Sequence, residues 1–174
     1  GEFTALTAAG VTSFADGLRI VRQRGRFMQE GCDATQGGMA GVIGLDEALT
    51  REVCAEAGVS LANLNCPGQL VISGASDKIE TACELAKAKG ARRALPLMVA
   101  GAYHSPLMAS AQPKLEAELA AVQFLAPVVP IISNVTALPH GAAEATRKLL
   151  VEQVTASVRW EESIRYLLKA GFTR

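Results

Sequence analysis

The sequence contains two histidines, and one of them stands where a side chain can do chemistry near neutral pH. His104 lies in the segment Gly101–Ser105 (GAYHS), a loop expected just before a helix, where it can face a cleft. Acyl transfer through a serine hydroxyl requires a general base of this kind. The alternative for a lone histidine is a structural role. His140 lies in a Pro-His-Gly turn and is expected to be exposed and without a role.

Arg24 is a second candidate, because helical geometry places its charge among apolar side chains. In the helix expected over residues 13–30, Arg24 falls between Ile20 and Met28, one turn from each. A guanidinium in this position must meet an anion, because burying it unpaired is costly. Two readings remain open: a salt bridge to a carboxylate of this protein, or a bidentate clamp on a substrate carboxylate.

The first residues, Gly1–Leu6 (GEFTAL), are similar to the second half of a G-x-S-x-G nucleophile elbow. In such an elbow the serine stands two residues before the last glycine, so it is expected upstream of Gly1. The printed chain is therefore expected to lack the attacking atom and, alone, to form no acyl-enzyme.

Other polar positions have more ordinary explanations. Ser105 fits the N-cap of the following helix better than it fits a nucleophile. Gln153, near a helix end, resembles an ordinary polar surface residue when it is considered alone. The segment Asn63–Gln69 (NLNCPGQ) has the composition of a turn, and the alternative is that amides such as Asn65 and Gln69 contact a polar ligand.

Residues 37–98 are expected to form a compact subdomain. Strands are predicted at 38–44, 60–65, 69–73 and 94–98, with helices at 46–57 and 76–89. The order βαββαβ is that of a split βαβ, or ferredoxin-like, unit. Such a unit closes on itself, so it is expected to be an insertion between two parts of a larger subdomain, residues 1–36 and 99–174.

The larger subdomain is expected to combine helices with a buried strand. Helices are predicted over residues 2–9, 13–30, 106–122, 142–153 and 161–170. Residues 128–134 (VVPIISN) form a continuous apolar run that is typical of a strand in a parallel sheet. Phe172 is expected to begin a further strand.

Composition argues against several classes of protein. The 174 residues are 49% hydrophobic, which disfavours disorder, and 17 basic residues cancel 17 acidic ones, which disfavours binding to nucleic acid. No apolar run reaches the length of a membrane span, so no membrane partner is expected. The four cysteines and two histidines lack metal-binding spacing, so no metal is expected and the cysteines are interpreted as thiols of a reducing compartment.

Taken together, several segments resemble the malonyl-CoA:acyl carrier protein transacylases, an acyltransferase family of fatty acid and polyketide synthesis. They occur in the family's order and at about its spacings, over essentially the whole sequence. The matching segments are Gly1–Leu6, Arg24–Gln29 (RGRFMQ), Asn63–Gln69, Gly101–Ser105, and Gln153 ahead of Val158–Trp160.

The resemblance implies an α/β fold, with an α/β-hydrolase-like large subdomain that is incomplete here and the ferredoxin-like unit inserted in it. It implies that a serine takes malonyl from malonyl-CoA as an ester and passes it to the phosphopantetheine thiol of acyl carrier protein. No cofactor is implied, since CoA enters as the substrate thioester. His104 would be the general base and acid, oriented by the backbone carbonyl of Gln153, while Arg24 would clamp the free carboxylate of malonyl.

The resemblance also implies how the substrate is selected. Acetyl offers Arg24 no anion and should be disfavoured. Met28 would line the pocket, and Asn65 and Gln69 would lie along the path of pantetheine and CoA. Tyr103 stands where the family usually has phenylalanine, in a segment associated with malonyl rather than methylmalonyl. Its added hydroxyl leaves the selection against an α-branch open.

Several settings are compatible with this sequence. A free-standing enzyme is favoured over a polyketide synthase domain, because nothing in the sequence resembles a linker. Bacterial cytosol, plastid and mitochondrion are all compatible locations. A non-catalytic scaffold that binds carrier protein is a competing hypothesis. A ferredoxin-like binding module acting through residues 38–98 is disfavoured by the catalytic-type residues outside it. The printed chain alone is expected to fold poorly, because a parallel sheet without its first strands exposes apolar edges.

Overall fold

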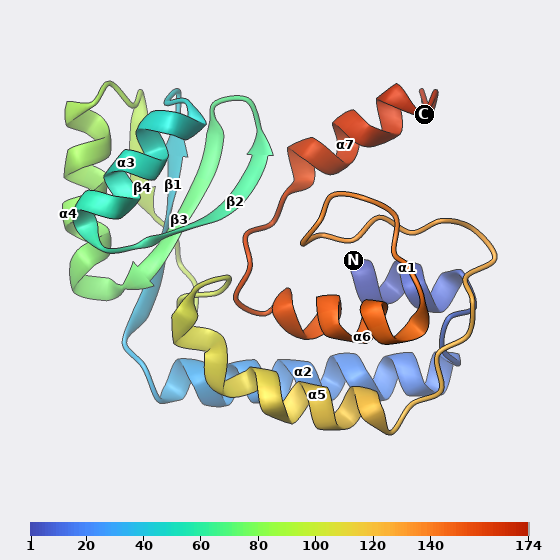
Figure 1. The fold of residues 1–174 in the computed structure, drawn as a ribbon. Helices are drawn as coiled ribbons and strands as arrows, with labels where there is room; N and C mark the ends of the chain where they lie inside the picture. Colours follow the sequence, from blue (N-terminus) through green and yellow to red (C-terminus); the bar gives the residue numbers. More distant parts are fainter. Residues whose placement is uncertain (174) are drawn as a thin grey trace.

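A four-stranded antiparallel sheet with two helices lies beside a separate layer of helices in the computed structural model, which describes residues 1–173 (Figure 1). The strand order is β2-β3-β1-β4, and every neighbouring pair is antiparallel. The elements of this small sheet unit are β1 (Gly37–Ile43), α3 (Glu47–Ala57), β2 (Ser60–Cys66), β3 (Gln69–Ala75), α4 (Ser76–Ala88) and β4 (Arg93–Pro96). The βαββαβ order predicted from the sequence is confirmed.

The small sheet unit has its own hydrophobic core between the sheet and its two helices. Alternate residues of the central strands, such as Val42 and Ile72, face α3 and α4 and are fully buried with Val53. Local signals fix the ends of α3. The Asp46 side chain accepts a hydrogen bond from the N–H of Leu49, and Gly58 ends the helix at a φ of +66°.

The remaining helices form a second layer, which we call the helical region. Its elements are α1 (Glu2–Ala8), α2 (Phe14–Asp33), the 3₁₀ helix η1 (Pro106–Ala111), α5 (Gln112–Ala120), α6 (Ala143–Glu152) and α7 (Trp160–Lys169). In Figure 1, α2 runs along the base of the molecule with α5 and α6 beside it. Ile20, Met108 and Leu150 from three of these helices are buried in one core.

The predicted strand over residues 128–134 is wrong. This segment is irregular apart from one isolated bridge between Ile132 and Pro139, and Val128 and Val129 are exposed. A parallel strand needs a neighbour to pair its backbone groups, and within residues 1–173 no strand lies beside this segment. Phe172 likewise lies outside any helix or strand and is exposed.

One extended segment fastens the helical region to the edge of the small sheet. The N–H of Leu64 donates to the carbonyl of Val158 over 2.8 Å, and the N–H of Val158 donates to Ala62 over 2.7 Å. The hydroxyl of Ser157 adds a hydrogen bond of 2.6 Å to the carbonyl of Leu61. The chain between α6 and α7 is therefore held against β2, which fixes the position of the residues just before it.

Candidate active site

His104 projects from the loop between β4 and η1 in a backbone conformation that few residues adopt. Its φ is +56°, in the left-handed region, which costs free energy for a residue with a Cβ. The loop is pinned on both sides by close approaches to glycines. A Cβ at Gly37 would lie 2.6 Å from the backbone nitrogen of Ala102, and one at Gly101 would collide with Cys32. These tight contacts leave the loop little freedom to relax.

The residue after His104 also fixes this loop. The buried hydroxyl of Ser105 donates to the carbonyl of Ala102 over 2.7 Å and accepts from the N–H of Leu107 over 3.3 Å. Ser105 is thus the N-cap of η1, as the sequence predicted. Its hydroxyl is engaged in structure and is not available as a nucleophile.

The imidazole of His104 is held by two backbone carbonyls. Its Nδ1 lies 2.9 Å from the oxygen of Ala156 and 3.2 Å from the oxygen of Gln153. Carbonyl oxygens only accept hydrogen bonds, so Nδ1 carries the proton and Nε2 of the neutral ring is the free acceptor. Burial lowers the pKa of His104, and the nearby charge of Arg24 lowers it further against the raising effect of the two carbonyls. The ring is therefore neutral and basic at Nε2 near pH 7.

Arg24, which lies on α2 between the buried residues Ile20 and Met28, projects toward Gln153 and Phe3. Its Nη2 donates to Oε1 of Gln153 over 3.5 Å, and its guanidinium carbon lies 5.9 Å from the centre of the Phe3 ring. The Nε–H is buried and has no partner within the described residues. Burial lowers the pKa of Arg24, while the charge of Glu2 acts in the opposite direction.

Gln153 joins these two groups. It follows the last residue of α6 and is 7% exposed, so the reading of it as a surface residue is wrong. Its carbonyl accepts from His104, its Oε1 accepts from Arg24, and its Nε2 donates to a carboxylate oxygen of Glu2. One residue thus contacts both the candidate base and the candidate anion clamp.

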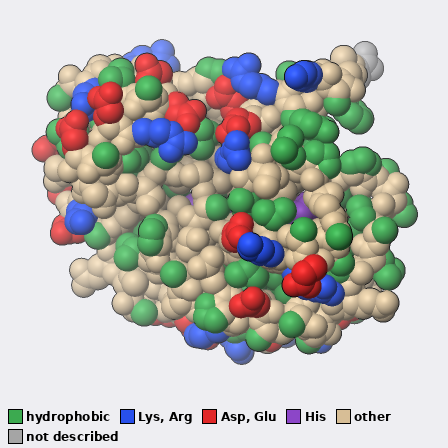
Figure 2. Space-filling model, in the orientation of Figure 1, with side chains coloured by type: hydrophobic (Ala, Val, Ile, Leu, Met, Phe, Trp, Pro, Cys, Tyr) green, Lys and Arg blue, Asp and Glu red, His purple; other side chains and the backbone are tan. Residues whose placement is uncertain are grey.

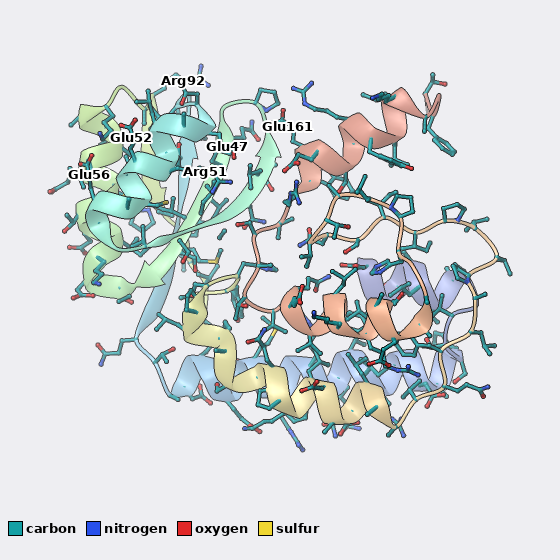
Figure 3. The ribbon with its side chains drawn as sticks, viewed as in Figure 1. Glu47, Arg51, Glu52, Glu56, Arg92 and Glu161 are labelled. Carbon is teal, nitrogen blue, oxygen red and sulfur yellow. The ribbon has the colours of Figure 1, made fainter. Side chains whose placement is uncertain are left out.

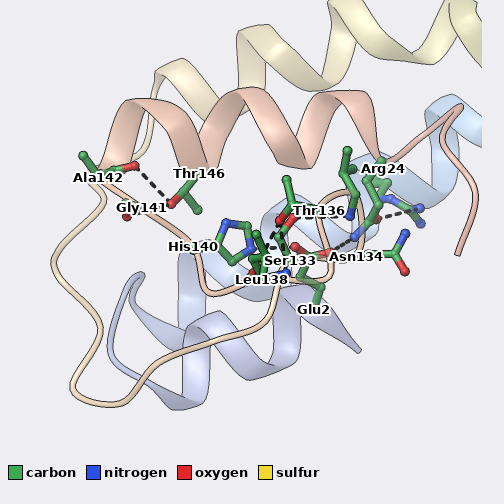
Figure 4. Close-up of polar contacts among 12 residues, drawn as sticks. Glu2, Arg24, Ser133, Asn134, Thr136, Leu138, His140, Gly141, Ala142 and Thr146 are labelled. Carbon is green, nitrogen blue, oxygen red and sulfur yellow. Dashed lines mark hydrogen bonds and ion pairs between the residues drawn. The ribbon is translucent and has the colours of Figure 1, made fainter. Parts of the chain in front are cut away.

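Glu2 and His140 belong to the same network, although the sequence analysis gave neither a role. Nε2 of His140 lies 2.6 Å from Oε1 of Glu2, and the His140 side chain is 1% exposed (Figure 4). The expectation that His140 is exposed is wrong, because the chain folds back on itself and bonds the N–H of His140 to the carbonyl of Ile131. Glu2 stood within a recognised motif, whereas no local signal marked His140.

The other predicted site residues are not bonded to this network within the described residues. Met28 is buried in the helical core, and Tyr103 is half-buried beside Cys32, whose side chain raises the pKa of the phenol through a hydrogen bond. Asn65 and Gln69 are exposed at the β2–β3 turn, at the top of the sheet in Figure 1 and away from α6. Within residues 1–173 no hydrogen bond joins these four side chains to His104 or Arg24.

His104 also borders a surface hollow of about 390 Å³ between α3 and the segment after α6. Arg51 and Ser60 line one side, and Thr155 lines the other. Charged side chains gather over this part of the molecule (Figure 2), and α3 presents Glu47, Arg51, Glu52 and Glu56 along its surface (Figure 3). Arg51 is paired with Glu47 at 2.7 Å, so the hollow has no free cation on this helix within the described structure.

Clustered metal ligands and thiols are the other groups that could do chemistry in the part of the chain that the structure describes. Within residues 1–173 no cluster of three His, Cys, Asp or Glu side chains is placed to hold a metal ion. All four cysteines are free, and burial raises the pKa of Cys54 to about 11, which leaves it a poor nucleophile. Among the helices of these residues, none has both the length and the apolar character needed to cross a membrane.

Comparison with known proteins gives consistent matches. The family of acyl transferase domains matches residues 1–172. A malonyl CoA-acyl carrier protein transacylase of Bacillus subtilis (strain 168) is 48% identical over 178 residues, covering 99% of this chain and 56% of its own length. The crystal structure of a malonyl-CoA:acyl carrier protein transacylase from Xanthomonas oryzae has a TM-score of 0.96 and 43% identity, covering all of this chain and 57% of its own.

A further solved structure is a complex of a type II PKS acyl-carrier protein with its malonyl-transacylase. It has a TM-score of 0.95 and 39% identity, and it covers 98% of this chain and 57% of its own. The chain therefore spans a little more than half the length of the relatives it matches. Over that length the fold is shared, and between 39% and 48% of the residues are identical.

Proposed function

Because the chain belongs to the acyl transferase domain family, we propose that its protein transfers malonyl from CoA to acyl carrier protein through a serine ester. The observation that carries the proposal is the position of Gln153, which holds a neutral histidine with its carbonyl and an arginine with its side chain. A base and an anion clamp are thereby set side by side, as transfer of an acyl group with a free carboxylate requires. The relatives named as malonyl transacylases support the same substrates.

His104 acts first as base and then as acid. We assign the nucleophile to a serine two residues before Gly1, as the match of Gly1–Leu6 to an elbow motif predicts. Nε2 of His104 takes the proton of the serine hydroxyl as its oxygen attacks the thioester carbon. The positive charge that forms on the ring is stabilised by the carbonyls of Gln153 and Ala156 at Nδ1. The same proton then passes to the departing thiolate of CoA.

The second half of the reaction runs the same chemistry with another thiol. Nε2 of His104 takes a proton from the phosphopantetheine thiol of acyl carrier protein, and the thiolate attacks the malonyl ester. The tetrahedral intermediate collapses, and the proton returns to the serine oxygen. The proposal includes no cofactor beyond the CoA thioester itself.

Arg24 supplies the selection for malonyl in this proposal. Within residues 1–173 its Nε–H has no partner and its one hydrogen bond is long, at 3.5 Å, so the guanidinium can donate two N–H bonds to a carboxylate. An acetyl group would leave the same buried donor without a partner, which costs free energy in the bound state. Met28, Tyr103, Asn65 and Gln69 remain proposed contacts of the acyl group, pantetheine and CoA.

The finer description of the fold is also a proposal. We assign residues 37–98 to an inserted ferredoxin-like subdomain, because the observed βαββαβ order and the β2-β3-β1-β4 sheet fit that unit. We assign residues 1–36 and 99–174 to part of an α/β-hydrolase-like subdomain. A role in polyketide rather than fatty acid synthesis is the second candidate, favoured by the likeness to the PKS malonyl-transacylase complex.

Intact-mass spectrometry of the full-length protein tests the function directly. Incubation with malonyl-CoA should add one malonyl group, and adding acyl carrier protein should remove it as the carrier protein gains the same mass. Replacing the serine two positions before Gly1 with alanine should abolish the adduct. A folded full-length protein that gains no malonyl would overturn the proposal and favour a non-catalytic scaffold that binds carrier protein.

A further inference from the structure

Glu2 and His140 are connected through Gln153 to His104 and Arg24, the two residues assigned to the reaction. We propose that this pair positions Gln153 and thereby sets the Arg24 guanidinium for an anionic acyl group. Glu2 and His140 are then positioning residues that help to determine the preference for malonyl over uncharged acyl groups. The inference rests on the proposed transfer of malonyl and adds to it two residues that have no assigned role.

Figure 4 shows Glu2 between His140 and Arg24, beneath α6. The Glu2 side chain is 6% exposed, and both of its oxygens are occupied: Oε1 meets Nε2 of His140, and Oε2 meets Nε2 of Gln153. A carboxylate fixed at both oxygens cannot rotate without breaking a buried hydrogen bond, which is costly. Glu2 therefore holds the Gln153 amide in a fixed position.

The polarity of these hydrogen bonds leaves one arrangement. An ionised carboxylate only accepts, so the Gln153 amide must turn its NH₂ group toward Glu2. Its Oε1 then faces Arg24, which only donates. If the amide turned over, an acceptor would face an acceptor at Glu2 and a donor would face a donor at Arg24. Glu2 thus dictates which end of Gln153 the arginine meets.

His140 completes the arrangement from the other side. Its Nε2 must carry a proton to donate to Glu2, and its Nδ1 is buried without a partner in the described structure. The irregular segment before α6 brings it there, through the bonds from the His140 N–H to Ile131 and from the Ser133 N–H to Leu138. This fold of the chain keeps the histidine against the carboxylate.

The pair leaves Arg24 oriented but incompletely satisfied. Its bond to Gln153 is long, and its Nε–H has no partner among residues 1–173. Burial lowers the pKa of Arg24, and the charge of Glu2 opposes this shift. An incoming carboxylate therefore meets a guanidinium that is already aimed and has donors free. Pre-orientation of this kind favours binding, because less conformational freedom is lost when the ligand arrives.

Steady-state kinetics of the full-length protein with malonyl-CoA and acetyl-CoA test this role. Glu2→Ala should lower kcat/KM for malonyl by about tenfold to a hundredfold, corresponding to lost contacts at a buried site. The slow transfer of acetyl should change far less, since acetyl makes no use of Arg24. His140→Ala should act in the same direction, and the double variant should lose less than the product of the two single effects.

Two further variants distinguish a positioning role from a general loss of folding or stability. Glu2→Gln can still accept from Gln153 and contact His140, so it should restore most of the malonyl preference. Lys148→Ala, at an exposed position of α6, should leave both activities unchanged. Thermal unfolding of each variant identifies any variant that fails to fold, and the comparison is then made with Glu2→Leu and His140→Leu, which fill the space but remove the polar contacts.

Failure of the proposed function and failure of the positioning role give different experimental results. If the unsubstituted protein forms no malonyl adduct, the proposed function fails. If it forms the adduct but Glu2→Ala and His140→Ala lower malonyl and acetyl transfer by equal factors, the pair is merely structural and the positioning role is overturned. Unchanged kinetics in both variants would overturn it as well.

Discussion

The small sheet unit and the helical region both carry charge pairs at the surface, but the helical region also has a buried charged network. In the small sheet unit the ion pairs lie at the surface, between Arg51 and Glu47 within α3 and between Lys89 and Glu52. In the helical region, Glu2, Arg24 and Gln153 are joined across the interior. Glu2 is 151 residues from Gln153 and 138 from His140, and Arg24 is 129 from Gln153.

This difference suggests that the two regions contribute differently to the stability of the protein and to its reaction. A surface pair four residues apart forms wherever its helix forms, and it contributes little to stability. A buried network between distant segments exists only in the completed fold, where low polarity strengthens each interaction and makes each unpaired group costly. We therefore expect substitutions in the network to change the reaction and substitutions in the small sheet unit to change stability.

The largest expected effect is at His104. His104→Asn removes the base but retains a residue that tolerates the positive φ of this position, so the loop should keep its shape. Malonyl transfer should fall by about a hundredfold to ten-thousandfold, the usual contribution of general acid–base catalysis. Initial rates of malonyl-CoA consumption by the full-length protein measure this, with thermal unfolding as the control for folding. Residual transfer within a few-fold of the unsubstituted rate would remove His104 from the mechanism.

A core substitution in the small sheet unit should show the opposite pattern. Ile72 is fully buried between the sheet and its helices, so Ile72→Ala should lower the free energy of unfolding by about 2–5 kcal/mol. Val71→Ala, on the other face of β3 and half-buried, should cost less. Urea denaturation of the full-length protein gives both values. If kcat for malonyl transfer fell as steeply as stability while the protein remained folded, the separation of the two regions would not hold.

The same contrast explains what the sequence could predict. The strands and helices of residues 37–98 were predicted to within about two residues, because helix ends such as Asp46 and Gly58 carry local signals. Arg24 was found because a charge on an apolar helix face is also a local pattern. His104 was a candidate base from its residue type and its loop, with a structural role left open, whereas Gln153 acquired a role only through the resemblance of several segments to one family.

The errors share one physical cause. Residues 128–134 were predicted as a strand from their apolar run, yet a strand requires a partner that the run itself does not reveal. His140 was predicted to be exposed from its turn sequence, but the folded-back segment buries it against Glu2. Each mistake concerns a contact between distant segments of the helical region. A pattern in a short window carries no information about such contacts.

Arg24 can be tested by its effect on the base. Its charge lowers the pKa of His104, so Arg24→Met should raise that pKa. Catalysis needs the neutral ring, so activity is lost as the pH falls through the pKa of His104. The acidic limb of the pH–activity profile should therefore move to higher pH in Arg24→Met. The pH profile of kcat/KM, which reports groups of the free enzyme, measures the shift. Arg24→Lys keeps the charge and should leave the limb in place, and an unmoved limb in Arg24→Met would show that the two groups are not coupled.

The smallest expected effect is at the surface of the small sheet unit. The Glu47 and Arg51 side chains are 50% and 57% exposed, so water and salt screen their pairing. Glu47→Gln should change the free energy of unfolding by about 0.3–0.5 kcal/mol and leave malonyl transfer unaltered. Urea denaturation at low and high salt measures the first, and initial rates measure the second. Arg51 lines the hollow beside His104, and Glu47 holds the Arg51 side chain in place. A clear loss of transfer would therefore mean that these charges take part in the reaction.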